Sequence, residues 1–216
     1  MTRWMRLLTV VVAVLMVSGC AVTRSEMDVS AVPVENPVDG AEVTFVRLAD
    51  ARDFQLEPGD PSTPSLKNGE IDDESITSRA IARKRNSYGQ ALGDIVLPEG
   101  KSVSHVVENR LSRGFAEKGY RVVKEGQEGY NQAVPLEVTI EKFWGWFTPG
   151  FVTIDLEFEM LVRVVGPLAG LRQGKTFEGG AKESFAAAVE DNWRKVMNAA
   201  LDNLDKDIDR KLPAPE

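Results

Sequence analysis

The clearest pattern of apolar and polar residues in the chain lies in residues 134–165, and it decides the predicted fold. This stretch reads VPLEVTIEKFWGWFTPGFVTIDLEFEMLVRVV. In each half, apolar side chains stand at every second position, which is the period of a β-strand with one buried face. The tripeptide TPG at 148–150 provides a turn. The pattern predicts a β-hairpin in which Phe147 pairs with Phe151, because that register keeps both apolar sets on one side.

Two amphipathic helices are predicted, one before the hairpin and one after it. The first begins with Ser102 as its cap and ends near Lys118, where Gly119 follows. The second covers about residues 186–211, with acidic residues in its first turn and basic residues in its last turn. In both, apolar side chains recur at spacings of three and four, which places them on one face.

These elements predict one α+β domain at residues 41–212. Further strands are expected at 42–48, 76–85, 120–124 and 175–185. Residues 86–100 are rich in turn-forming residues, and residues 50–75 are predicted to be a long mobile loop. The expected architecture is an antiparallel sheet with two helices packed on one face, preceded by a lipidated flexible tether.

The first residues have the three parts of an export signal: basic Arg3 and Arg6, an apolar run at 7–17, and small residues before Cys20. Val17-Ser18-Gly19-Cys20 resembles the lipobox of bacterial lipoproteins. That resemblance implies a signal peptide at residues 1–19, cleavage between Gly19 and Cys20, and acyl chains on Cys20. The alternative is an ordinary signal or a signal anchor in which Cys20 plays no part.

Ala21 follows the predicted lipidation site. In the enterobacterial sorting rule that this arrangement resembles, Asp at that position holds a lipoprotein in the inner membrane. Ala21 therefore indicates the inner leaflet of the outer membrane, with the body facing the periplasm. Residues 20–40 contain prolines and polar residues without a sustained period, so they are predicted to be a flexible tether.

Composition excludes several classes of function. The formal net charge is −7, whereas a nucleic-acid binder carries a basic excess. With one Cys and one His, the chain has neither an internal disulfide nor the usual Cys-rich or His-rich metal site. We therefore expect no metal and no cofactor.

Three weaker patterns could indicate a phosphate-binding, catalytic or cation-binding site, but each is better explained by a structural role or a solvent-exposed surface. Residues 169–176 loosely match a phosphate-binding loop, but Gly179 and Gly180 follow where a helix should begin. His105 lies opposite the apolar stripe of its helix and has no evident catalytic partner. The acidic residues are expected on solvated surfaces, although close carboxylates can hold a cation; they are Asp72, Asp73, Glu74, Glu137, Glu141, Asp155, Glu157 and Glu159.

Aromatic residues gather around the hairpin turn: Phe143, Trp144, Trp146, Phe147 and Phe151. The alternation predicts that the two tryptophans face the core and that Phe143 and Phe147 face away from it. Those two rings would pack beneath the 50–75 loop or meet something outside the domain. The alternatives are therefore ordinary packing at the hairpin end and a contact surface for a partner or lipid.

The body resembles the YajG-like family of bacterial outer-membrane lipoproteins. The matching pieces are LADAR at 48–52, RNSYG at 85–89, EKGYRVV at 117–123 and VTIE at 138–141 with the tryptophan-rich stretch after it. Together they lie within about residues 41–185. The resemblance implies a non-enzymatic envelope lipoprotein and supplies no catalytic residues. The loop at 54–75 is longer than the family pattern.

Two functions are compatible with these observations. The first is a non-enzymatic binding or assembly module of the cell envelope, tethered to the outer membrane and contacting an envelope protein or ligand that the sequence does not identify. The second is an envelope hydrolase or glycan-modifying enzyme that uses paired carboxylates. The missing nucleophile and base favour the first. The sequence does not determine the oligomeric state.

Overall fold

The structure, a computed structural model, describes residues 24–85 and 90–215. The predicted signal peptide, Cys20 and Ala21 lie outside these residues. The strands are β1 (Ser25–Glu26), β2 (Ala41–Asp50), β3 (Ala80–Arg85), β4 (Ala91–Val96), β5 (Tyr120–Val122), β6 (Val134–Pro149), β7 (Ile154–Val165) and β8 (Lys175–Phe185). The helices are α2 (Glu74–Thr77), α3 (Val103–Glu117) and α4 (Glu190–Lys211), with a 3-10 turn, η2, at Lys67–Gly69.

All eight strands belong to one mixed sheet built around β6. On one edge, β6 pairs with β7 in the predicted antiparallel hairpin, and β8 continues the sheet beyond β7. On its other edge, β6 pairs in parallel with β2 and, near Gly145, with β3. The pairs β2–β5 and β1–β4 are parallel as well. The sheet is therefore mixed and not antiparallel as predicted, because β2 and β6 are joined by a crossover that contains α3.

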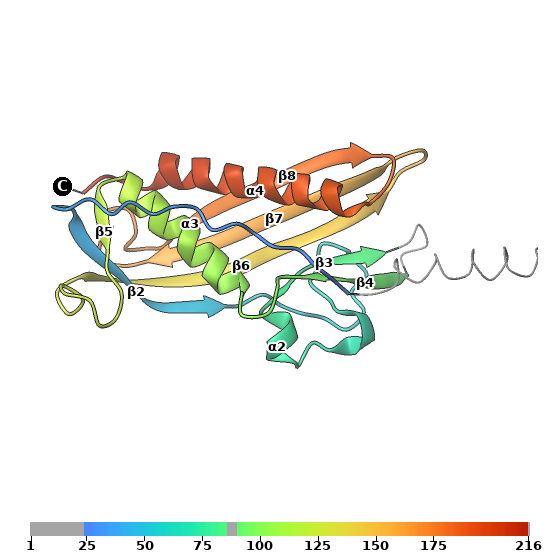
Figure 1. Cartoon of the computed structure of the whole chain (residues 1–216), viewed down its shortest axis with the longest axis horizontal. Helices are drawn as coiled ribbons and strands as arrows, with labels where there is room; N and C mark the ends of the chain where they lie inside the picture. The colour runs from blue at the N-terminus through green and yellow to red at the C-terminus, as the bar shows by residue number, and fades with distance from the viewer. Residues whose placement is uncertain (1–23, 86–89, 216) are drawn as a thin grey trace, which may run out of the picture.

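Helices α3 and α4 lie over one face of the sheet, and α2 with the long loop before it lies on the other side (Figure 1). The helix predictions are confirmed closely: the Ser102 hydroxyl caps α3 by accepting the His105 N–H at 3.2 Å, and Gly119 after its end has a φ of 96°. Helix α4 packs on β7 and β8, and α3 packs on β2 and β5. Their apolar stripes and the inner face of the hairpin form the main core.

A β-bulge in β6 reverses the faces of every residue that follows it. Ile140 pairs with Val162, but Lys142 pairs with Leu161, so Glu141 is an extra residue in the strand. The bulge places Phe143 and Phe147 in the main core under the helices, while Trp144 joins a second cluster on the opposite face. The predicted orientation of these aromatic residues is therefore wrong. So is the predicted register, since Phe147 pairs with Leu156 and not with Phe151.

Residues 24–40 do not form the free tether that the sequence predicts. Strand β1 pairs with β4, and Met27 and Val29 are buried at 2% and 5% exposure. Farther along, the Asn36 side chain makes a pair of hydrogen bonds with the backbone of Val122, at 3.2 and 3.1 Å. The segment crosses the body beside α3 as an extended strap (Figure 1).

Residues 50–75 are also packed on the body, contrary to the prediction of a mobile loop. Ser65 and Leu66 are fully buried, and η2 follows them. The strand expected at 76–85 begins only at Ala80, because α2 occupies residues 74–77. Strand β4 lies within the region predicted to be turns, and it gives β3 its antiparallel partner.

Candidate functional site

The second hydrophobic cluster lies beneath the long loop, on the face of the sheet away from the helices. It contains Trp144, Leu66, Ala80 and Val96, all buried. The Trp144 indole N–H donates to the Pro61 carbonyl at 3.3 Å, and its ring meets Phe54 edge to face at 5.8 Å between centroids. The loop is therefore held by a tryptophan that β6 presents to it.

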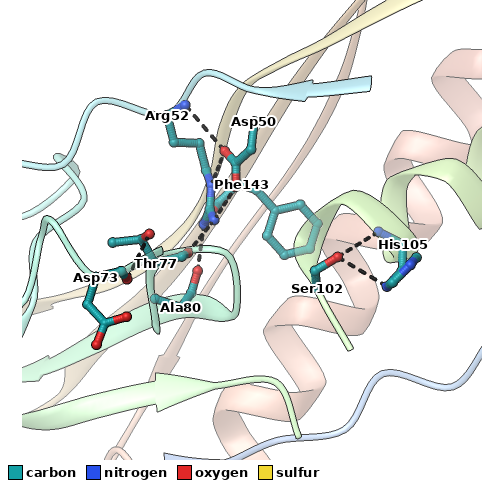
Figure 2. A network of polar contacts seen from close by, with 8 residues as sticks. All are labelled: Asp50, Arg52, Asp73, Thr77, Ala80, Ser102, His105 and Phe143. Carbon is teal, nitrogen blue, oxygen red and sulfur yellow. Dashed lines mark hydrogen bonds and ion pairs between the residues drawn. The ribbon is translucent and has the colours of Figure 1, made fainter. Parts of the chain in front are cut away.

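Arg52 fixes the start of the same loop (Figure 2). Its side chain is fully buried and ion-paired with Asp50, with Nε to Oδ1 at 2.8 Å and Nη2 to Oδ2 at 2.7 Å. Nη1 donates to the carbonyls of Ala80 and Phe143, and Nη2 donates to that of Thr77. These five contacts use all five N–H donors of a guanidinium group. Arg52 therefore has no donor left for a ligand, and its role is structural.

The acidic residues of β7 face lysines across the sheet. Lys182 Nζ lies 3.1 Å from carboxylate oxygens of both Asp155 and Glu157, and Lys142 Nζ lies 2.5 Å from Glu159. Hydrogen bonds from Ser184 and Lys182 hold the pKa of Asp155 below its usual value. No group of His, Cys, Asp and Glu side chains suited to a metal ion occurs within residues 24–85 and 90–215. The arrangement is that of a solvated, charge-paired sheet face.

The remaining weak candidates lie where no chemistry is evident. His105 is exposed, and its Nδ1 lies 3.2 Å from the Ser102 hydroxyl oxygen (Figure 2). The phosphate-loop-like stretch 169–176 covers the end of the β7–β8 connection and the first two residues of β8, so a strand begins where a phosphate-binding loop would open a helix. In the acidic run, the Asp73 side chain caps α2.

The predicted aromatic contact surface is mostly buried. Phe143, Trp144 and Phe147 are at most 5% exposed, and Trp146 is half-buried with Lys142 Nζ 5.2 Å from its ring centroid. Only Phe151 at the hairpin tip is fully exposed, and Val152 beside it is 80% exposed. The contact-surface prediction therefore fails for Phe143, Trp144 and Phe147, and it is reduced to the tip.

A cavity that sequence reasoning missed lies between the ends of β3 and β4 and the start of α4. Its volume is about 330 Å³. Apolar side chains form most of the wall, and Ser25, Lys84, Arg85 and Glu190 are its polar members; the apolar ones are Leu92, Ile95, Phe147, Ala188 and Trp193. We call it the β3–α4 pocket. An apolar wall with a few placed polar groups is typical of small-molecule sites.

Two polar groups of the β3–α4 pocket are incompletely satisfied. Lys84 is half-buried, and its ammonium group forms no hydrogen bond or ion pair with any described residue. Burial lowers the pKa of this ammonium group, and the charges of Glu190 and Asp94 oppose that shift. Trp193 is 1% exposed, and its indole N–H has no acceptor among the described residues. A buried donor without an acceptor is uncommon and calls for an explanation.

Arg85 also lines the pocket, but its guanidinium is directed to the long loop on the other face of the sheet. Its Nη2 donates to the Ser65 hydroxyl at 3.2 Å, and burial lowers its pKa. Glu190 supplies the opposing negative charge from the first turn of α4. The pocket therefore combines apolar walls with one ammonium group, that of Lys84, and one carboxylate, that of Glu190. The sequence signal for it was the basic run at 83–85 inside a predicted strand, but the partner residues lie far away in the sequence.

Comparison with known proteins does not assign the chain to a family. No family model and no curated protein matches it. Among solved structures, it is similar to a crystal structure of an uncharacterized protein at 12% identity and a TM-score of 0.44, covering 88% of this chain and 99% of that one. It is also similar to protein XCC0632 from Xanthomonas campestris, of family DUF330, at 11% identity and a TM-score of 0.39, covering 86% of this chain and 91% of that one. These likenesses are too distant to carry a function.

Proposed function

We propose that the protein is a lipoprotein of the YajG-like kind, anchored by acyl chains on Cys20 in the inner leaflet of the outer membrane, and that it acts as a non-enzymatic binding module facing the periplasm. Among the described residues, no helix is long and apolar enough to cross a membrane. In this proposal, the acyl chains on Cys20 attach the protein to the bilayer. Several acyl chains make such an anchor stable.

The observation that carries the binding role is the position of the β3–α4 pocket in the chain. Ser25 lines this pocket and is five residues after Cys20. Five residues reach at most roughly 17 Å. Because the strap at 24–40 is docked on the body, an anchor at Cys20 would keep the pocket close to the membrane surface.

The exposed hairpin tip supports the same orientation. Figure 1 places the tip of the β6–β7 hairpin, the ends of β3 and β4, and the start of the described chain toward the same end of the elongated molecule. Phe151 and Val152 at that tip are large apolar residues left in solvent. An end with exposed apolar side chains and a pocket is suited to contacting a membrane or a component held in it.

The anchor is tested by labelling cells with radioactive palmitate. The wild-type protein should take up the label, and Cys20→Ser should not. In a sucrose-gradient separation of the two membranes, wild type should fractionate with the outer membrane, and Ala21→Asp should move toward the inner membrane. Equal labelling of wild type and Cys20→Ser would contradict the proposal.

A further inference from the structure

The β3–α4 pocket has the chemistry of a site for an amphiphile, and the argument begins with its walls. Phe147, Ile95 and Trp193 are at most 5% exposed, yet all three contribute to the cavity surface. An apolar cavity wall gains free energy when hydrocarbon replaces water against it. The walls therefore favour an acyl or similar chain.

The polar groups of the pocket add a requirement for negative charge. Lys84 holds an ammonium group in a half-buried position without a hydrogen-bonded anion. Among the described lining residues, Glu190 supplies the carboxylate; its charge acts on Lys84, but the two side chains form no ion pair. An anionic oxygen beside Lys84 would restore the charge-assisted hydrogen bonds that burial has removed.

We propose that the β3–α4 pocket binds the anionic head and the adjoining part of the chain of a membrane amphiphile, a carboxylate or phosphate carried on an acyl chain. This inference rests on the proposed function, because the anchor at Cys20 is what brings the pocket to a lipid source. The volume of about 330 Å³ is at the small end for ligand sites, so it holds the head region, and the rest of the chain extends outside.

The experiment uses the lipidated protein purified from membranes and reconstituted in vesicles of phosphatidylethanolamine. Three photoreactive probes carry a diazirine on the first third of an acyl chain: a fatty acid, a phosphatidylglycerol and an uncharged diacylglycerol. After irradiation, mass spectrometry locates the crosslinks. We expect an anionic probe to label residues that line the pocket, and the uncharged probe to leave them unlabelled. Labelling by the fatty acid alone indicates a free fatty acid, and labelling by phosphatidylglycerol alone indicates a membrane phospholipid; either supports the proposal.

Lys84→Gln tests the charged group, and Lys182→Gln is the matched control because Lys182 is an exposed lysine of the same sheet. Loss of one charge-assisted hydrogen bond corresponds to roughly tenfold weaker binding or more, so crosslinking in Lys84→Gln should fall by about that factor. Lys182→Gln should match wild type. Three results would overturn the proposal: equal labelling by the uncharged probe, undiminished labelling of Lys84→Gln, or full competition by millimolar inorganic phosphate.

Palmitate labelling of the same preparations separates this inference from the proposed function. A palmitoylated protein whose pocket takes up no anionic probe overturns the inference and leaves the anchor standing. A protein that carries no palmitate overturns the anchor, and with it the proposed source of the lipid.

Discussion

Phe143 and Trp144 are neighbours in the sequence, are both completely buried, and lie on opposite faces of the same sheet. Phe143 packs edge to face on Phe158 at 5.4 Å in the main core, whereas Trp144 packs on Phe54 beneath the long loop. Strand β6 is thus buried on both faces at this point. The sheet joins two hydrophobic clusters here, and the hairpin end is a structural centre of the fold.

Truncating Phe147 to alanine should destabilise the protein strongly, whereas truncating Phe151 should leave its stability nearly unchanged. Phe147 is 5% exposed in the main core, so Phe147→Ala should lower the free energy of unfolding by about 3–5 kcal/mol. Phe151 is fully exposed, so Phe151→Ala should change it by less than about 0.5 kcal/mol. Urea denaturation measures both. Similar values for the two variants would mean that the register past the bulge is wrong.

Gly145 is a position where β6 has no room for a side chain. A Cβ added there would lie 2.7 Å from a Phe158 ring carbon and 3.2 Å from the Ala82 Cβ. Gly145→Ala should therefore destabilise the protein by about 1–3 kcal/mol through overpacking. Gly59→Ala is the control, because a Cβ there meets nothing within 4 Å. Thermal unfolding that ranks Gly59→Ala as the more damaging variant would contradict this packing.

Arg52 should be necessary for the position of the long loop. Arg52→Gln removes the partner of Asp50 and leaves the carbonyls of Ala80, Phe143 and Thr77 without their donor. Leaving the buried carbonyls of Ala80 and Phe143 without a donor should lower the free energy of unfolding by at least about 2 kcal/mol. Arg47→Gln, at an exposed arginine of β2, should be nearly neutral. Limited proteolysis should cut residues 50–75 faster in Arg52→Gln only; equal cleavage of both variants would argue against this role.

The carboxyl group of Asp207 should make the free energy of unfolding fall at low pH. Burial alone would raise the pKa of Asp207, but hydrogen bonds from Lys211, from the Glu178 N–H at 2.8 Å and from Arg210 outweigh it and hold that pKa below its usual value. A carboxyl with a lowered pKa in the folded state contributes stability above its unfolded pKa of about 3.9, and this stability is lost as pH falls through the folded pKa.

Unfolding measured between pH 6 and pH 2.5 checks this prediction. The wild-type free energy of unfolding should fall more steeply below about pH 4 than that of Asp207→Asn, which has no carboxyl to protonate. Asp209→Asn, at an exposed position two residues farther along the same helix, is the control and should follow wild type. Parallel curves for wild type and Asp207→Asn would show that the pKa of Asp207 is not lowered.

The main strands and helices could be predicted from the sequence because each has a regular spacing of apolar residues. Alternation at every second residue predicted β6 and β7, and apolar spacings of three and four predicted α3 and α4, with Ser102 and Gly119 marking the ends of α3. In these segments the buried face is set by the order of side chains along a regular backbone, and neighbours in sequence are neighbours in space.

The faces of the aromatic residues in β6 could not be obtained in this way. A single extra residue, Glu141, inverts the alternation, and with aromatic residues at 143, 144, 146 and 147 either phase leaves rings on both faces. Which phase holds is decided by what covers each face, namely the helices on one side and the loop fixed by Arg52 on the other. The parallel pairing of β2 with β6 is likewise a long-range contact with no local signature.

The strands of the hairpin and the two long helices could be predicted from the sequence, since each is encoded in consecutive residues. Lipid attachment at Cys20 stays a prediction. The docking of residues 24–40, and the pocket that joins Lys84 of β3 to Trp193 of α4, 109 positions apart, became evident only from the folded chain. Burial and charge at a site depend on which surfaces folding brings together. A periodic pattern specifies which face of an element is buried, but not which partner buries it.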